Sequence, residues 1–160
     1  MGSASASVAL REITADTVRA ICALRVAPAQ ERLVAPNAVS IAQAHFEPAA
    51  GCCAIYAGDE PVGFVMLNDP TRDSIRATAP EQPDTCHLWR FMIAEQHQGH
   101  GYGGAALTQL ISHSRSLAGV TKFSLSFVPD GVGPRDFYAR YGFRETGEVD
   151  EGEVVMELAL

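Results

Sequence analysis

Apolar residues recur with two different periods along the chain, and the change of period divides it into strand-like and helical segments. The strand-like segments are residues 8–13, 52–57, 62–69, 86–94, 120–128 and a closing strand pair within 142–158. The helical segments are residues 14–26, a second that begins near Ser40, then 101–118 and 134–141. The order β-α-α-β-β-β-α-β-α-β-β predicts an α/β fold in which helices flank a mixed sheet.

Local signals predict where several of these elements begin and end. Thr14 is a candidate cap of the first helix, and Ser40 and Gln43 have capping-box spacing at the start of the second. Gly58 to Pro61 is a hairpin signal, and the polar stretch Pro70–Asp84 is the expected flexible loop. One face of the longest helix collects Leu107, Leu110, Ile111, Ser114, Leu117 and Ala118.

Composition limits the classes to which the protein can belong. The chain has 160 residues, 47% of them apolar and 19% charged, which predicts one domain over residues 1–160 with residues 1–6 disordered. No apolar run is long enough for a membrane span and no signal peptide is evident, so a cytoplasmic location is expected. The formal net charge of −7 disfavours nucleic acid and anionic membranes as partners. The four cysteines form no CxxC pair, and no metal site is expected.

The stretch QHQGHGYGG, residues 96–104, joins a strand to a helix and contains four glycines. Free N–H groups at a helix N-terminus favour an anion, and glycine lets a phosphate approach the backbone. An ATP-binding loop would need Lys and Ser or Thr after Gly104, and these are missing. Gly99, Gly101 and Gly104 fit a dinucleotide fingerprint, but no acidic residue lies between Glu95 and Asp130. A third pattern, Q/R-x-x-G-x-G/A, is met at residues 98–103.

That third pattern, together with FYARYGF at residues 137–143, resembles the GNAT superfamily of N-acetyltransferases, which use acetyl-CoA as co-substrate. The resemblance covers most of the chain and implies a mostly antiparallel central sheet with about four helices. Segments such as PVGFVML and LWRFMIA are similar to bacterial spermine/spermidine or diamine acetyltransferases. The expected reaction is direct acetyl transfer to a primary amine of a small cationic acceptor, in a ternary complex.

The resemblance also implies which residues bind the cofactor. The strand before the turn would lie along the pantetheine arm, with a bulge near Met92 or Ile93 and its free N–H groups on the thioester. Many members carry an asparagine after the fifth strand, where this chain has residues 129–134, whose glycines would replace that amide by backbone. The implied cofactor-binding residues are Phe91, Met92, Ile93, Gln98, Gly99, His100, Gly101, Tyr102, Gly103, Gly104, Phe137 and Arg140.

Tyr138 matches the family tyrosine that protonates the leaving thiolate. A phenol can deliver a proton to a thiolate of comparable basicity, although Tyr138 could instead serve only packing. Glu95 is the candidate base, acting directly or through water, or else caps the turn; His87 is a candidate proton relay. The expected acceptor-binding residues are Trp89, Arg90, Asn37, Glu47 and Asp84.

Three functions compete at this level. The first is the amine acetyltransferase, with a homodimer among the expected assemblies. The second is a CoA-binding sensor or inactive partner domain that keeps the turn without turnover. The third is an acetyltransferase for a protein or antibiotic amine, which would differ only in its acceptor.

Overall fold

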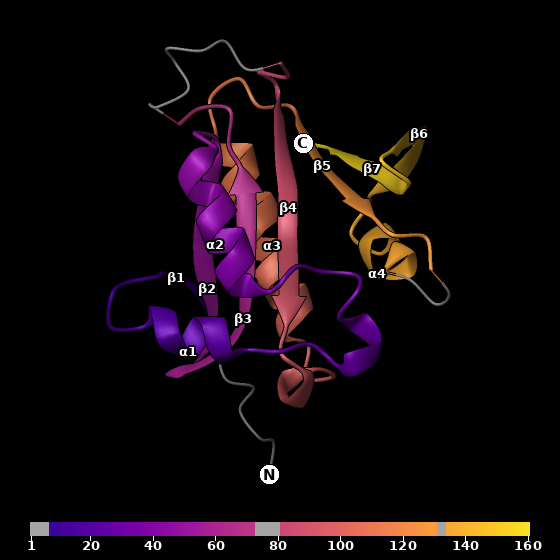
Figure 1. The fold of residues 1–160 in the computed structure, drawn as a ribbon. Helices are drawn as coiled ribbons and strands as arrows, with labels where there is room; N and C mark the ends of the chain where they lie inside the picture. Colours follow the sequence, from indigo (N-terminus) through magenta and orange to yellow (C-terminus); the bar gives the residue numbers. More distant parts are fainter. Residues whose placement is uncertain (1–6, 73–80, 131–133) are drawn as a thin grey trace.

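A seven-stranded sheet runs through the part of the chain that the structure, a computed structural model, describes: residues 7–72, 81–130 and 134–160. Its strands lie in the order β1-β2-β3-β4-β5-β7-β6 (Figure 1). The bounds are β1 Val8–Glu12, β2 Ala50–Ala57, β3 Glu60–Asn68, β4 Thr85–Ile93, β5 Lys122–Phe127, β6 Arg144–Asp150 and β7 Glu153–Ala159. Neighbouring strands are antiparallel except for β4 and β5. The predicted mixed, mostly antiparallel sheet is confirmed.

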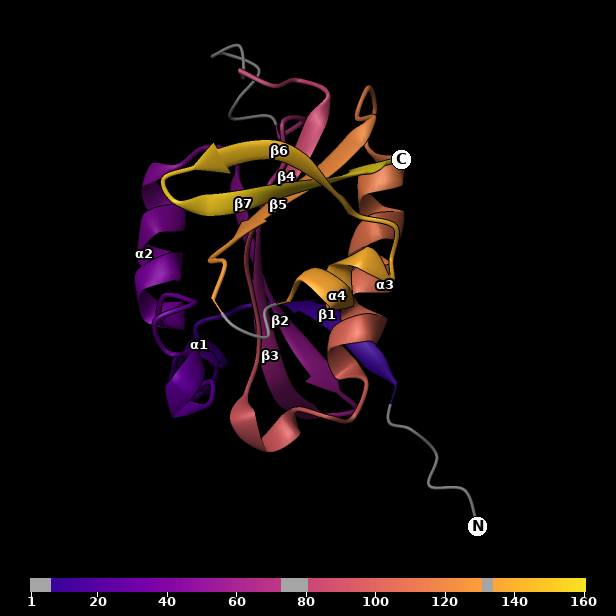
Figure 2. The same cartoon turned by 90° about the vertical axis from the view of Figure 1, so that its right-hand side faces the viewer.

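Helices cover both faces of this sheet (Figure 2). The described helices are α1 Val18–Ala23, α2 Asn37–Phe46, α3 Tyr102–Ser116 and α4 Arg135–Ala139, with short 3-10 turns at Pro28–Gln30 and Glu95–His97. α1 and α2 lie on one face, and α3 lies on the other with α4 beside it. The predicted order of elements is therefore confirmed.

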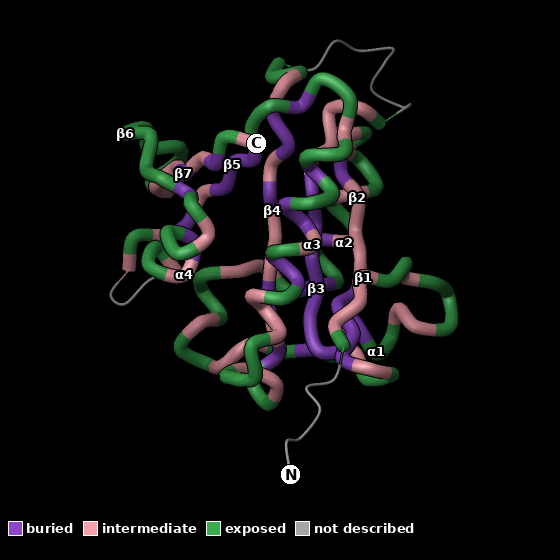
Figure 3. The backbone as a smooth tube through the Cα atoms, turned by 180° about the vertical axis from the view of Figure 1, so that it is seen from behind, coloured by how far each residue is buried: buried purple, intermediate pink, exposed green. Residues whose placement is uncertain are grey.

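Two apolar cores follow from this layering, one on each face of the sheet (Figure 3). Under α3, the buried face of the helix packs on alternate residues of β5, namely Phe123, Leu125 and Phe127. Under α1 and α2, Ile21 packs with Phe64 and Met66 of β3. Because side chains alternate across a strand, the polar residues between the buried ones of β5 must face away from α3.

The parallel pair β4–β5 is much shorter than its two strands. Pairing begins at Thr85 with Lys122 and ends at Leu88 with Leu125. Beyond that point β4 continues to Ile93 beside β3 alone, and β5 continues to Phe127 beside β7 alone. The two strands diverge in Figure 1, which opens the sheet at its centre.

Two boundary predictions and the bulge prediction were wrong. α2 begins at Asn37, directly after Pro36, and Ser40 is a buried residue inside it; contact with the core overrides the capping-box pattern there. The N-cap of α1 is Thr17, not Thr14, because residues 15–17 form a turn first. The register shift in β4 leaves Trp89 without a pairing partner on β3, so the bulge lies at Trp89 and not at Met92 or Ile93.

Several expectations concern positions whose structure is not described: the disorder of residues 1–6, the centre of the Pro70–Asp84 loop (73–80), and the two glycines at 131 and 133. Cys22, Cys52, Cys53 and Cys86 are free thiols, and Cys52 and Cys53 pack on opposite faces of the sheet. Among the described residues no group of three or more His, Cys, Asp or Glu is arranged to hold a metal. No helix in those ranges is both long and apolar enough to cross a membrane.

Candidate active site

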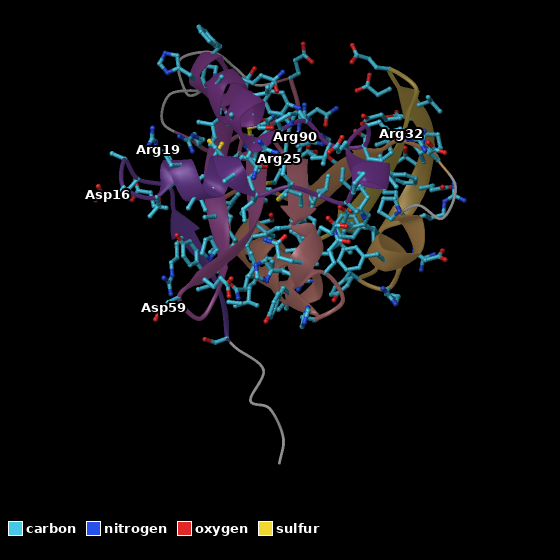
Figure 4. The ribbon with its side chains drawn as sticks, turned by 60° about the horizontal axis from the view of Figure 1, so that its bottom comes forward. Asp16, Arg19, Arg25, Arg32, Asp59 and Arg90 are labelled. Carbon is cyan, nitrogen blue, oxygen red and sulfur yellow. The ribbon has the colours of Figure 1, made fainter. Side chains whose placement is uncertain are left out.

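A cavity of about 640 Å³ lies where β4 and β5 diverge. This volume is typical of small-molecule and cofactor sites. Its walls come from the 24–36 connector between α1 and α2, the free part of β4, the end of β5, and Tyr138 of α4. Figure 4 labels two arginines that line it, Arg32 on the connector and Arg90 on β4. Segments far apart in the sequence therefore meet at the opening in the sheet.

The backbone of β4 presents free N–H groups to this cavity. The Ala94 N–H donates to the Val62 carbonyl at 2.8 Å, on the side of β3. Hydrogen-bonding sides alternate along an antiparallel strand, so Met92 also bonds towards β3, while Phe91 and Ile93 point their N–H groups to the open side. A buried N–H group without a partner is costly, which makes these two amides ready donors for a ligand amide or carbonyl.

The bulge at Trp89 changes which side chains face the connector. Leu88 and Phe91 both pack in the core under α3, so the two residues between them, Trp89 and Arg90, share the opposite face. Arg90 lies over the Trp89 ring at 5.3 Å, donates to the Trp89 carbonyl at 3.0 Å, and reaches Gln43 of α2 at 3.5 Å. Burial lowers the pKa of Arg90, and its Nε has no hydrogen-bond partner among the described atoms. Trp89 and Arg90, two of the residues expected to bind the acceptor, thus line the cavity.

The glycine turn has the backbone that its sequence demands. Gly99 and Gly101 adopt φ values of 78° and 80°, in the left-handed region that only glycine enters cheaply. α3 begins at Tyr102 with no side-chain cap, so the N–H groups of its first turn remain available to an anion. The Gln98 side chain donates to the Ile93 carbonyl at 2.9 Å and to Gln30 at 2.8 Å, so it fixes the turn to β4 and the connector.

Aromatic rings support the turn from α4. A Cβ on Gly104 would clash with the Tyr141 hydroxyl oxygen, so this glycine makes room for the Tyr141 side chain, which follows α4. Phe137 stacks on Phe91 of β4 with centroids 6.5 Å apart, and the Arg140 guanidinium lies 5.9 Å from the Phe137 ring. Gly103 faces Ile93 and Phe137 at ordinary contact distances. The remaining two predicted residues, His100 and Tyr102, stack on each other at 5.5 Å.

Tyr138 links this aromatic cluster to the cavity. Its backbone N–H donates to Pro134 at 3.0 Å, and its ring packs edge-on against Phe137 and Phe143. It is 8% exposed and lines the cavity. Burial raises the pKa of Tyr138, so the phenol keeps its proton throughout the neutral range.

The other predicted site residues lie away from the cavity walls. Asn37 is buried and donates to the Ile21 carbonyl at 2.9 Å, which joins α1 to α2. Glu95 is exposed at the start of the turn, and its N–H donates to the Arg25 carbonyl at 2.8 Å. Asp84 lies before β4, 3.9 Å from Lys122, and Glu47 follows α2. None of these four is among the residues that line the cavity.

Sequence reasoning missed four polar residues that line the cavity. Arg32 and Asp130 form an ion pair across the cavity mouth. Ser126 of β5 donates to the Glu153 carboxylate of β7 at 2.5 Å. Period-two alternation in β5 and β7 was the available signal, because the apolar positions of each strand were already assigned to the core and the residues between them had to face outward.

A second, polar cavity of about 470 Å³ adjoins the first through Ser126. It lies under the β6–β7 hairpin, where His87 Nδ1 and Ser124 Oγ are 2.8 Å apart. Burial lowers the pKa of His87, so its imidazole is neutral at neutral pH. Three further carboxylates line this second cavity: Glu148, Asp150 and Glu157.

Comparison with known proteins matches this chain to one family model. Residues 18–143 match the model described as acetyltransferase (GNAT) family. The spermine/spermidine N(1)-acetyltransferase of Bacillus subtilis (strain 168) is 30% identical over 157 residues, which cover 94% of this chain and 97% of the relative.

Solved structures share the fold at lower identity. Aminoglycoside acetyltransferase AAC(6')-Ib, in complex with coenzyme A, is 16% identical with a TM-score of 0.73, over 96% of this chain and 95% of that one. A GNAT family acetyltransferase from Elizabethkingia anophelis, with acetyl-CoA bound, is 17% identical with a TM-score of 0.65, over 96% and 99%. At these identities the two structures support the fold assignment.

Proposed function

Because the chain belongs to the acetyltransferase (GNAT) family, we propose that it moves the acetyl group of acetyl-CoA directly onto a primary amine of a small cationic acceptor, a polyamine or diamine. The earlier prediction of an acetyl-CoA-dependent N-acetyltransferase is confirmed at the level of the family. The observation that carries the proposal is the opening between β4 and β5, which holds free backbone donors and Tyr138 in one cavity.

The residues around this opening fit acetyl-CoA. The Phe91 and Ile93 N–H groups would bond the pantetheine arm and the thioester oxygen. The uncapped start of α3, with the Cβ-free Gly99 and Gly101 before it, would hold the diphosphate. Phe137 and Arg140 lie on the α4 side of the same turn. Holding donor and acceptor together in this way supplies much of the rate by proximity.

Tyr138 is the proposed general acid. Acetyl transfer releases a thiolate, and a phenol that remains protonated at neutral pH has a proton to give it. Its place in the cavity, on the same helix as Phe137 of the cofactor side, supports this role. Its packing against Phe137 and Phe143 holds the ring in place.

Carboxylates on the face opposite α3 support a cationic acceptor. Glu153 lines the first cavity, and Glu148, Asp150 and Glu157 line the second. Ammonium groups are stabilised beside carboxylates in a partly buried setting. The relative from Bacillus subtilis, named for spermine and spermidine, agrees in substrate class with this charge distribution.

An acceptor-panel assay tests the proposal. The purified chain is incubated with acetyl-CoA and spermidine, spermine, simple diamines, an aminoglycoside or a lysine-containing peptide, while thiol release is followed and products are weighed by mass spectrometry. We expect thiol release with polyamines and a product heavier by one acetyl group. Binding of acetyl-CoA without turnover on any acceptor would indicate a sensor, and turnover only on the aminoglycoside or the peptide would reassign the acceptor.

A further inference from the structure

Glu153 is the first residue of β7 and reaches into the cavity from the edge of the opening. Met156 and Leu158 of β7 are buried in the core under α3, so alternation places Glu153, Val155 and Glu157 on the opposite face. The same rule turns Ser126 of β5 to that face, and its hydroxyl donates to Glu153 Oε2 at 2.5 Å. Glu153 is therefore held at the acceptor-side wall of the opening by a short hydrogen bond.

The charges around the cavity leave this carboxylate as the one available to an amine. Asp130, the other carboxylate that lines the cavity, is paired with Arg32. Within the described residues no ion pair of 4 Å or less involves Glu153, whose hydrogen-bond partner is the neutral Ser126. Tyr138, on α4, lines the same cavity from the core side of the sheet. A proton acceptor and a proton donor thus lie in one cavity, on different sides of the opening.

We propose that Glu153 binds the reactive amine of the acceptor and takes its proton during acetyl transfer, with Ser126 as the positioning residue; this rests on the proposed function. The bound ammonium first gives one proton to the Glu153 carboxylate, and the neutral nitrogen then attacks the thioester carbon, so that a C–N bond forms as the C–S bond breaks. The departing thiolate takes a proton from Tyr138, and the second proton of the nitrogen restores the phenol. The products are the N-acetylated amine and CoA.

The surroundings of Glu153 suit this task. The Ser126 hydroxyl donates to the Glu153 carboxylate and so holds it at the cavity wall. Other titratable groups around it are Arg90 and His87 from β4 and Asp150 from β6. The Arg90 guanidinium also disfavours a second positive charge in the cavity, which helps the bound amine to lose its proton.

The test replaces the carboxylate by an amide of the same shape. Glu153→Gln is compared with wild type for kcat/KM against pH, with spermidine and with a primary amine whose pKa lies below the assay pH. We expect a loss of about 10²-fold with spermidine, the usual size of a base contribution, and less than about tenfold with the neutral amine. The affinity for acetyl-CoA and the melting temperature remain those of wild type.

Three further variants complete the set. Ser126→Ala removes the hydroxyl that positions Glu153, so we expect kcat with spermidine to fall several-fold with less change for the neutral amine, whereas Ser126→Thr, which keeps a hydroxyl, should restore it. Glu151→Gln, at an exposed position in the same hairpin, removes an equal charge and should behave as wild type. This variant controls for the loss of one negative charge from the hairpin.

Equal losses with both amines, an unchanged Glu153→Gln, or a loss found in Glu95→Gln instead would overturn the role of Glu153. If wild type and Glu153→Gln acetylate spermidine at the same rate, the proposed function stands and another group is the base. If the wild type acetylates no amine at all, the proposed function fails, and the role of Glu153 fails with it.

Discussion

The two sides of the opening between β4 and β5 are built by different means. The side proposed for acetyl-CoA consists of backbone and buried rings: left-handed glycines, the uncapped start of α3, and α4 aromatics that pack in the core. The side proposed for the acceptor consists of polar side chains from the connector, the bulge and the β6–β7 hairpin. All seven residues of β6 are exposed. A fold can thus keep one co-substrate constant through its backbone while side chains at the other wall select the second.

After Glu153→Gln, the largest expected effect is at Tyr138, the proposed general acid on the acetyl-CoA side. Tyr138→Phe removes the hydroxyl and keeps the ring that packs against Phe137 and Phe143. We expect kcat to fall by roughly tenfold or more, because the thiolate loses its proton donor, while acetyl-CoA affinity remains. Steady-state thiol release and calorimetric titration measure the two quantities.

An unchanged kcat in that variant would leave Tyr138 with a packing role only. A melting temperature close to wild type is the control, since the substitution removes no apolar contact.

A smaller effect is expected at Gly101, where a substitution tests whether the backbone of the turn contributes to acetyl-CoA affinity apart from its contribution to stability. Gly101→Ala forces a Cβ into a left-handed conformation, which costs about 1 kcal/mol or more in the free energy of unfolding, and moves the phosphate-facing turn. We expect acetyl-CoA affinity to fall several-fold. Isothermal titration and chemical denaturation measure these changes.

Gly119 offers a matched control, because it has φ of 77°, at the other end of α3. A Cβ would meet no atom within 4 Å at either glycine. Gly119→Ala should therefore lose similar stability without weaker acetyl-CoA binding. Equal weakening in both variants would mean that the turn acts through stability alone.

The smallest expected effect concerns His87, which lines the second cavity under the β6–β7 hairpin. Burial lowers the pKa of His87 below its ordinary 6.5, so the unfolded chain binds the proton more readily. The stability of the fold should therefore fall as pH falls below about 6.5, by at most about 1.4 kcal/mol per pH unit for this one group. Urea denaturation of wild type and His87→Gln between about pH 7 and pH 5 measures the difference.

The variant should show a shallower pH dependence than wild type in that window. Parallel curves would mean that His87 titrates alike in both states, and that the polar cavity is more open to water than its burial indicates.

The sequence predicted the backbone of the glycine turn better than the polar wall of the cavity, and the reason is physical. A left-handed turn requires glycine at particular positions, so Gly99 and Gly101 predict the backbone conformation of the turn from the local sequence alone. The stripe of α3 is likewise a local pattern, and it is confirmed where Leu107, Leu110, Ile111 and Ser114 are buried, but it was wrong at Ala118, which is exposed beyond the end of the helix. The predicted common side of Phe123, Leu125 and Phe127 on β5 is confirmed by their place in the core under α3. Elements of this kind can be predicted from their own residues.

The features missed from the sequence depend on partners distant along the chain. The bulge at Trp89 exists only in the register of β4 against β3, which no segment of β4 specifies by itself. The start of α2 depends on how Asn37 and Ser40 are buried against other elements. The position of Glu153 beside Ser126 could not be predicted from its own hairpin, because it depends on the pairing of β7 with β5.

The short pairing of β4 with β5 also has a consequence for isotope exchange along a single strand. Amides at Met92 and Ala94 are bonded to β3, whereas those at Phe91 and Ile93 face the opening. Deuterium should then enter β4 at every second residue, although the strand lies at the centre of the sheet. Once a pantetheine arm bonds the other two amides, the alternation should disappear, so the residue-by-residue exchange pattern of one strand would report whether the co-substrate is bound.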